Sequence, residues 1–385
     1  MKRILSAPRP DWQATAERLG FHFHTFDGEP YWDESAYYQF SLRQIEDDLE
    51  EPTRQLHELC MELVERVVDS EQLLDRLAIP EGYRDLIRHS WRQGHPHLYG
   101  RMDLCYDGNG PAKLLETNYD TPTSLYEASF FQYVWLEEQM RRGQLPAHAD
   151  QFNSLEDKLL QAFVETGFQS PFHFASVRDS LEDRGTVEYL SDIARQAGLV
   201  THLIDIEAIG LDRSGCFVDE QDQPISTLFK LYPWENLFNE AFGPAIGHSR
   251  TLFVEPPWKA ILSNKGALAL LWEMHEGHPN LLPAFIDPDP SGRPARGWVR
   301  KPFFSREGAN VEIQTPTGER FSEPGPYDQG PFVLQQFQPL PTFAGSYTVL
   351  GSWMIGDQPA GIGIREDHSL ITKDTSRFLP HIILD

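Results

Sequence analysis

The sequence predicts an α+β protein in which two or three subdomains pack closely together. A helical repeat of apolar residues lies in the first hundred residues, a strand–helix–strand unit lies between 172 and 206, and strands dominate the final third. At 385 residues the chain is longer than a typical single-core domain. We therefore expect a support region over 1–100, an α/β region over 101–250 and a strand-rich region over 251–385.

The charge balance restricts the possible partners. The chain carries 58 acidic and 33 basic side chains, a formal net charge of −25, which disfavours nucleic acid and anionic lipid. A phosphate ligand would therefore need local positive charge. Three widely spaced cysteines form neither a disulfide framework nor a zinc motif, and no secretion signal or membrane-length apolar run is present. We expect a soluble, cytoplasmic protein, and the sequence predicts no oligomeric state.

Caps and periodicity place the helices and strands. The first helix is expected from Leu56, Leu59, Cys60, Leu63 and Val67. Ser124-Leu-Tyr-Glu127 and Ser154-Leu-Glu-Asp157 each have the form of a capping box, and the second helix should stop at Gly167. The strand–helix–strand unit is expected at 172–177, 186–197 and 200–206. The later strands are expected at 297–301, 311–314, 331–337, 347–355 and 360–365.

A β-hairpin is expected just after the first hundred residues, around the turn Asp107-Gly-Asn-Gly110. Because strand side chains alternate, Arg101 and Asp103 would share one face of the first strand, as Glu116 and Asn118 would on the second. Two carboxylates and an amide are hard oxygen ligands suited to Mg²⁺, and the arginine would complement phosphate oxygens. The alternative is an ordinary hairpin with a solvated polar face.

Two lysines and a loop could provide the local positive charge. Lys265 follows Ser263-Asn264 at the start of an apolar helix, where a cation opposes the helix dipole unless an anion compensates it. Lys301 ends a predicted strand, and the polar loop 304–310 that follows carries Arg306. Such a loop could fold over phosphates. A surface lysine and a plain solvated loop are the alternative interpretations.

Further polar residues lie near the end of the chain. Gln335 and Gln336 end an apolar strand against which a purine could lie, although a core strand would look the same. Arg365 and Lys373 lie near turns, where surface ion pairs would also explain them. P-loop and Rossmann motifs are absent, the histidine pairs lack a third zinc ligand, and no motif indicates a covalent nucleophile.

Taken in order, these motifs resemble the synthetase domain of glutathionylspermidine synthases, from about residue 30 to the C-terminus. The resemblance is carried by Arg101-x-Asp103, Glu116-x-Asn118-x-Asp120-Thr-Pro-Thr-Ser124, Lys230-Leu-Tyr-Pro-Trp234-Glu235, Asn264-Lys265, Val299-Arg-Lys301-Pro, Ser305-Arg306-Glu-Gly-Ala-Asn310, Gln335-Gln336 and Ile364-Arg365-Glu-Asp. It implies an ATP-grasp fold in rearranged order, with a pre-ATP-grasp α/β subdomain, in which the metal-binding strands precede the nucleotide-binding lysines.

The resemblance also implies roles for individual residues. The Mg²⁺ ligands would be Asp103, Glu116 and Asn118. ATP would be held by Lys265, Lys301, Gln335 and Gln336, with Lys373 as a further candidate. Arg101, Arg306 and Arg365 would act at the reacting phosphates and the intermediate. The acid or peptide substrate would be held near Ser124, Glu182, Asp183 and Lys230.

The implied activity is that of an ATP-dependent carboxylate–amine ligase. A peptide or glutathione-like carboxylate would become an acyl phosphate, and a polyamine or another amine would attack it. The bifunctional members of the family carry an N-terminal amidase domain, which this chain is not expected to contain, so product hydrolysis is not expected. The alternatives are an ATP-binding pseudo-ligase that acts as a sensor, and a non-catalytic acidic scaffold.

Overall fold

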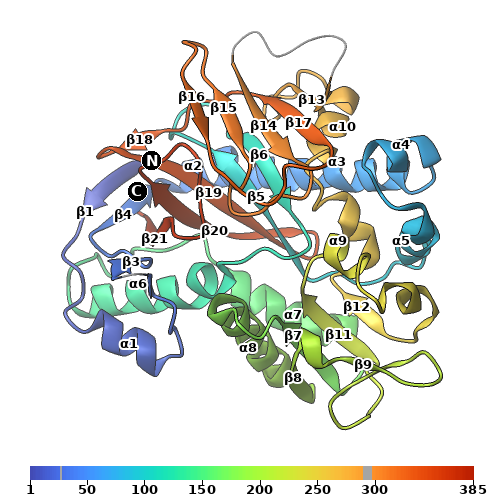
Figure 1. Cartoon of the computed structure of the whole chain (residues 1–385). Coiled ribbons are helices and arrows are strands. Elements are labelled where there is room, and N and C mark those ends of the chain that lie inside the picture. Colours follow the sequence, from blue (N-terminus) through green and yellow to red (C-terminus); the bar gives the residue numbers. More distant parts are fainter. Residues whose placement is uncertain (27, 289–296) are drawn as a thin grey trace.

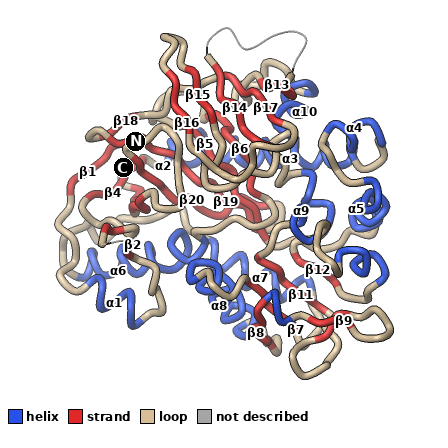
Figure 2. The backbone as a smooth tube through the Cα atoms, viewed as in Figure 1, coloured by secondary structure: helices blue, strands red, loops and turns tan. Residues whose placement is uncertain are grey.

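The structure, a computed structural model, describes residues 1–26, 28–288 and 297–385 and confirms the α+β class. Figure 1 shows a central sheet whose strands come from distant parts of the sequence, with a five-stranded sheet above it and a four-stranded sheet below it. Helices cover the lower sheet and run behind the central one (Figure 1). Several loops lie between the upper sheet and the central sheet (Figure 2). This layering places the functional site, because the loops and strand faces of two sheets meet there.

The predicted hairpin forms and lies in the central sheet. The strands of that sheet are β5 Tyr99–Cys105, β6 Lys113–Asn118, β18 Thr342–Phe343, β19 Ser346–Ile355, β20 Gln358–Asp367 and β21 Arg377–Leu379. Asp103 lies opposite Glu116, and Arg101 opposite Asn118, in antiparallel register. The sheet order β21-β20-β19-β5-β6 joins this early hairpin to strands of the last forty or so residues. The three predicted subdomain ranges stay a prediction.

A close approach fixes the pairing of β5 with β19. Gly351 lies opposite Asp103, and a Cβ added to it would meet Arg101 Cδ at 2.8 Å. The missing side chain therefore leaves room for the arginine to lie across β19. The Arg101 guanidinium lies 5.7 Å from the ring centre of Trp353, its own register partner.

The upper sheet is antiparallel, in the order β13-β17-β14-β15-β16. Its strands are β13 Ala284–Asp287, β14 Trp298–Pro302, β15 Glu312–Gln314, β16 Arg320–Ser322 and β17 Phe332–Gln336. The helix α10 Ala267–Met274 packs on β13 and β17. Val299 pairs with Gln335 and Lys301 with Val333, so Lys301 and Gln335 point to one face. The predicted strands of the final third are thus confirmed.

The lower sheet contains the predicted βαβ unit. It is parallel, in the order β12-β11-β7-β8, with strands β7 Phe172–Ser176, β8 Thr201–Asp205, β11 Thr227–Leu231 and β12 Leu252–Val254. The helices of this part of the chain are α6 Gln132–Arg141, α7 Leu155–Thr166 and α8 Leu181–Gln196. The Ser180 hydroxyl caps α8 by accepting a hydrogen bond from the Asp183 amide. The helix therefore begins earlier than the predicted residue 186. Glu182 and Asp183 therefore lie in its first turn.

Both predicted capping boxes are wrong, although the helices lie where they were expected. Ser154 donates its hydroxyl to the Ala360 carbonyl rather than accepting from α7, which does end at Gly167 in a left-handed conformation. Ser124 has a φ of 70° and makes no side-chain cap. The chain there enters a π-helical turn, Glu127–Phe131, ahead of α6. Glu127 is thereby free for another role.

The N-terminal region supports the central sheet. β4 Ala36–Phe40 pairs with β1 Lys2–Leu5 on one side and with β22 His381–Ile383 on the other, so the two chain ends lie in one small sheet (Figure 1). The predicted first helix is α3 Glu51–Val67, which buries Leu56, Cys60, Leu63 and Val67. The remaining short elements are α1 Trp12–Arg18, α2 Leu42–Ile45, α4 Glu71–Arg76, α5 Arg84–Arg92, α9 Trp234–Leu237, β2 Thr25–Phe26, β3 Glu29–Pro30, β9 Gly210–Leu211 and β10 Phe217–Val218. Within the described ranges, every helix is too short or too polar to cross a membrane.

Candidate functional site

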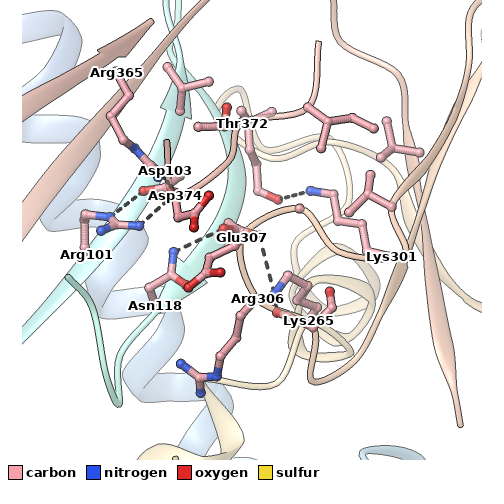
Figure 3. Close-up of a pocket in the computed structure, with 18 of the residues that line it drawn as sticks. Arg101, Asp103, Asn118, Lys265, Lys301, Arg306, Glu307, Arg365, Thr372 and Asp374 are labelled. Atoms are coloured by element: carbon pink, nitrogen blue, oxygen red, sulfur yellow. Dashed lines mark hydrogen bonds and ion pairs between the residues drawn. The ribbon is translucent and has the colours of Figure 1, made fainter. Parts of the chain in front are cut away.

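A pocket lies where the central and upper sheets face one another, closed over by the loops at 303–310 and 370–374. Five cationic and five acidic side chains line it: Arg101, Lys265, Lys301, Arg306, Arg365, Asp103, Glu116, Glu182, Glu307 and Asp374. Figure 3 shows Arg101, Asp103 and Arg365 on one side and Lys301 on the other. The local positive charge that a phosphate ligand would need is therefore present, in a chain of net charge −25.

Asp103 is held between two arginines. Arg101 donates through Nε to one carboxylate oxygen at 2.7 Å and through a terminal nitrogen to the other at 3.2 Å. Arg365 reaches the second oxygen at 2.7 Å from β20. Arg101 also donates to the Thr123 carbonyl at 2.7 Å. This forked geometry holds two guanidinium groups at the pocket wall, where their remaining N–H groups could bind a second anion.

Glu116 faces two lysines. Its carboxylate accepts from the Asn118 amide at 3.3 Å and lies 3.6 Å from Lys265 Nζ. Burial alone would raise the pKa of Glu116, but the positive charges of Lys265 and Lys301 lower it to about 2. Burial lowers the pKa of Lys301 to about 8, although Glu116 opposes this shift. At neutral pH the carboxylate is therefore ionised beside a lysine that desolvation disfavours as a cation.

Backbone carbonyls aim the lysines into the pocket. Lys301 Nζ donates to the Leu115 carbonyl at 2.8 Å and to Gln335 Oε1 at 3.0 Å, and Gln335 donates in turn to the Leu114 carbonyl. Lys265 Nζ donates to the Ser305 carbonyl. Asn264 Oδ1 accepts a hydrogen bond from the Gly266 amide at 2.8 Å just before α10, so this side chain satisfies a backbone donor at the start of the helix.

Arg306 ties its loop to the opposite side of the pocket. It donates to Thr121 Oγ1 at 2.5 Å and to Glu235 Oε1 at 3.0 Å. Glu307 and Asn310 have φ values of 53° and 57°, so the loop turns sharply on both sides of Gly308. Figure 3 shows Arg306 and Glu307 between the two walls. The predicted loop therefore lies over the site.

Of the residues predicted to hold a substrate, two line the pocket and two do not. Ser124 and Glu182 line it. Asp183 lies on the same helical turn, outside the lining. Lys230 is fully buried, pairs with Asp120 and does not line the pocket. Among the predicted nucleotide residues, Gln335 and Gln336 line the pocket, but Lys373 pairs with Glu323 at 2.8 Å outside it.

Lys230 has a structural partner set instead. Besides Asp120, it donates to the Tyr232 carbonyl at 3.0 Å and lies 4.4 Å from the Trp234 ring centre, while Asp120 also accepts the Trp234 amide at 2.8 Å. Burial lowers the pKa of Lys230, and the Asp120 charge opposes that shift. The pair thus fastens the segment after β6, which carries Thr121 and Thr123, to the lower sheet.

Replacing Lys230 with methionine should destabilise the fold by about 3–5 kcal/mol, because it leaves the Asp120 carboxylate buried without a counter-charge. Urea unfolding measures the loss. The matched control is Arg178→Met, since Arg178 pairs with Asp205 from a largely exposed position and should cost less than about 1 kcal/mol. Equal losses in the two variants would contradict the structural role.

Four pocket-side residues were not predicted. Glu307 and Asp374 come from the two covering loops, and a solvated loop carries no pattern that marks them. Tyr31 lines the pocket from the support region, well before the hairpin in sequence. Its hydroxyl donates to Glu127 at 2.5 Å, whereas the sequence pattern assigned Glu127 to a cap. The only usable signal was a glutamate in the middle of an otherwise apolar run.

The oxygen ligands of the hairpin fit a divalent cation of one particular kind. Among the described residues no three histidine, cysteine or acidic side chains gather as a metal cluster. Asp103, Glu116 and Asn118 nevertheless share one face of the hairpin as register partners, and both carboxylates are engaged only by cations and an amide. Such a set suits Mg²⁺, which completes its shell with water and phosphate oxygens rather than with a full protein cage.

The fold and pocket define a class: an α+β protein with a pocket between two sheets that is lined by charged side chains. Comparison with known sequences then narrows it. Residues 3–384 match the family model "Glutathionylspermidine synthase preATP-grasp". The "Putative acid--amine ligase" of Haemophilus influenzae is 39% identical over 396 residues, which cover 99% of each chain. The chain belongs to this glutathionylspermidine synthase family.

More distant relatives are longer than this chain. The trypanothione synthetase of Crithidia fasciculata is 29% identical over 84% of the chain and 53% of its own length. The bifunctional glutathionylspermidine synthetase/amidase of Escherichia coli is 25% identical over 91% of the chain and 60% of its own length. A glutathione synthetase-like effector, GSS30 of Globodera pallida, shares the fold with a TM-score of 0.57 at 12% identity, covering 99% of this chain and 100% of its own.

Proposed function

We propose that the protein is an ATP-dependent ligase that joins a carboxylate to an amine through an acyl phosphate, on a rearranged ATP-grasp arrangement of the central and upper sheets. One observation carries the proposal: five cations and the Asp103–Glu116 carboxylate pair meet in a single pocket between the two sheets. Phosphoryl transfer depends mainly on positioning and on neutralising charge, and this pocket provides both. The names of the relatives support the same class.

The nucleotide would lie along the upper sheet. Lys265 and Lys301 would contact the phosphates, and Gln335 and Gln336, which also line the pocket, would lie beside the adenine. Asp103, Glu116 and Asn118 would hold Mg²⁺, which would offset the negative charge of the phosphates. The ion pairs that Lys265 and Arg365 now make with acidic side chains would then be shared with phosphate.

The arginines would stabilise the transferred phosphoryl group. Arg101 and Arg365 lie on either side of Asp103, and Arg306 approaches from the covering loop. Because an acyl phosphate hydrolyses readily, a covering loop held to Thr121 and Glu235 would exclude water while the intermediate exists. This chain's residues thus bind, orient and shield the intermediate.

The acidic part of the pocket favours an amine as the second substrate. Glu182, Glu307 and Asp374 approach it from three different segments, and none of these three carboxylates forms a salt bridge within the described residues. A protonated amine would supply the missing charge. By analogy with the names of the longer relatives, glutathione is the first acid to test and spermidine the first amine.

The proposal predicts hydroxamate formation. The protein, Mg-ATP, an acid from a panel of glutathione and other short peptides, and hydroxylamine should give ADP and the hydroxamate of the acid that is accepted, because hydroxylamine traps an acyl phosphate. Coupled ADP release and mass spectrometry measure the two products. A rise in melting temperature with ATP but no product with any acid would instead support the nucleotide-binding sensor. No shift with ATP would support the scaffold.

A further inference from the structure

A buried carboxyl group lies directly behind the acidic wall of the pocket. Glu127 is fully buried at the first position of the π-helical turn, and Tyr31 donates its hydroxyl to Glu127 Oε1 at 2.5 Å. The other carboxyl oxygen, Oε2, is buried and has no hydrogen-bond partner within the part of the chain that the structure describes. Tyr31 itself lines the pocket, with its hydroxyl 3.4 Å from Ser124 Oγ. The tyrosine therefore connects the pocket to a carboxyl group that no substrate could reach directly.

The surroundings of Glu127 bring the pKa of its carboxyl group close to neutral pH. Burial raises the pKa of Glu127 to about 7, while the Tyr31 hydrogen bond and the positive charges of Arg101 and Arg365 oppose the shift. Burial and the nearby Glu127 charge raise the pKa of Glu182, in the wall beside it, to about 8. A structural glutamate would gain nothing from this environment, because an unpartnered buried oxygen costs free energy.

We propose that Tyr31 and Glu127 form a proton relay that accepts the proton the amine must lose before it can attack. The inference rests on the proposed ligase function and assigns one step within it. It is carried by the geometry: one hydroxyl at the pocket surface, one short hydrogen bond, and one buried carboxylate with a free oxygen.

In this relay one proton moves from the amine through Tyr31 to Glu127. An alkylamine is an ammonium ion at neutral pH and has no lone pair for attack. Tyr31 Oη accepts one ammonium proton and passes its own proton to the Glu127 carboxylate, so the tyrosine is unchanged, the amine is neutral and the glutamic acid is protonated. The amine nitrogen then forms a bond to the acyl carbon while the carbon–oxygen bond to phosphate breaks, and phosphate leaves. The second amine proton is released as the amide forms.

Two nucleophiles separate this role from a structural one. Hydroxylamine is uncharged at neutral pH and needs no deprotonation before attack, whereas spermidine does. Tyr31→Phe and Glu127→Gln should therefore lower the amide rate with spermidine by about a hundredfold relative to the hydroxamate rate of the same variant, the low end of general acid–base catalysis. The matched control is Tyr126→Phe, which removes a buried hydroxyl beside Glu127 that donates to the Leu19 carbonyl rather than to the relay.

The pH profile supplies a readout that misfolding would not move. In the unsubstituted protein the spermidine rate should rise as Glu127 ionises, through a pH near its pKa of about 7. The charged and titrating neighbours that set this value are Tyr31, Glu182, Arg101 and Arg365. In either relay variant the rise should move to higher pH, where free amine becomes available from solution, so the deficit shrinks as pH increases.

The outcomes are distinct. A selective loss with spermidine and a shifted profile in both relay variants support the relay. Equal losses with both nucleophiles, or an unshifted profile, overturn it and leave Glu127 a positioning group for Tyr31. If Glu127→Gln fails to fold, as its melting temperature would show, Tyr31→Phe decides alone, because that substitution keeps the buried aromatic ring and removes only the hydroxyl. Absence of any hydroxamate from the unsubstituted protein would instead contradict the ligase function itself.

Discussion

Replacing Asp103 with asparagine is expected to lower ATP-dependent product formation by about a thousandfold, the upper range for loss of one preorganised electrostatic group. The change removes the carboxylate that holds Arg101 and Arg365 and that would contribute an oxygen to Mg²⁺. Both guanidinium groups would then lie in the pocket without their shared anion. The turnover number at saturating Mg-ATP is the measurement.

The matched control for this variant is Glu58→Gln, which breaks an ion pair to Arg54 on the surface of α3, away from the pocket, and should leave turnover within about twofold, as expected of an exposed pair. A stronger version combines Asp103→Asn with Glu116→Gln. Because the two are direct register partners, the double variant loses both carboxylates of the hairpin. Unchanged ADP release by the double variant would refute the assignment of the site.

Replacing Arg306 with glutamine is expected to uncouple ADP release from amide formation. The arginine holds the covering loop to Thr121 and Glu235, so its loss should admit water to the acyl phosphate. We expect amide formation to fall by about a hundredfold, within the range that one positioned charge contributes, and ADP release to fall much less. The ratio of amide to ADP, measured in the same reaction, reports the uncoupling.

Arg300→Gln is the control for the loop variant. Arg300 is on β14, next to the same loop in sequence, but it pairs with Asp287 and Glu312 and does not line the pocket. Its ratio of amide to ADP should stay at that of the unsubstituted protein. If Arg306→Gln also kept the ratio while both rates fell together, the loop would act on phosphoryl transfer rather than on shielding.

The parts of the fold that the sequence predicts well depend on short-range patterns. Alternation of side chains and the Asp107–Gly110 turn predict the hairpin and the shared faces of Arg101 with Asp103 and of Glu116 with Asn118, and the structure adds that Asp103 lies opposite Glu116. The βαβ unit follows from periodicity and a helix stop at Gly198. What these patterns cannot show is that β5 pairs with β19, because that contact depends on Gly351 and Trp353, some 250 residues later.

The errors at the site arise where one residue type serves several purposes. Glu127 matches a capping box, yet a positive φ at Ser124 changes the entry to the helix and directs the carboxyl group to Tyr31. Lys230 resembles a substrate contact in sequence, but only its complete burial against Asp120 shows that it is a structural cation. Burial and long-range partners are properties of the folded chain, so a local pattern does not carry them.

The site itself lies where the central and upper sheets face one another. The hairpin provides carboxylates and an arginine from the central sheet, and Lys301 with Gln335 comes from the upper one. A substrate bound between them would contact segments that are far apart in sequence, as Figure 3 shows for Arg101 and Lys301. Movement of the upper sheet against the central one would therefore open or close the site without unfolding either sheet.

Transfer of a heavy-oxygen label tests the central claim most directly. The acid that supports hydroxamate formation, glutathione in the first instance, is labelled in its carboxylates and incubated with the protein, Mg-ATP and spermidine. An acyl phosphate passes one carboxylate oxygen to the phosphate that leaves, so the inorganic phosphate should carry one labelled oxygen for each amide formed. Amide that accumulates while the phosphate stays unlabelled would contradict activation of the carboxylate by phosphoryl transfer in this pocket.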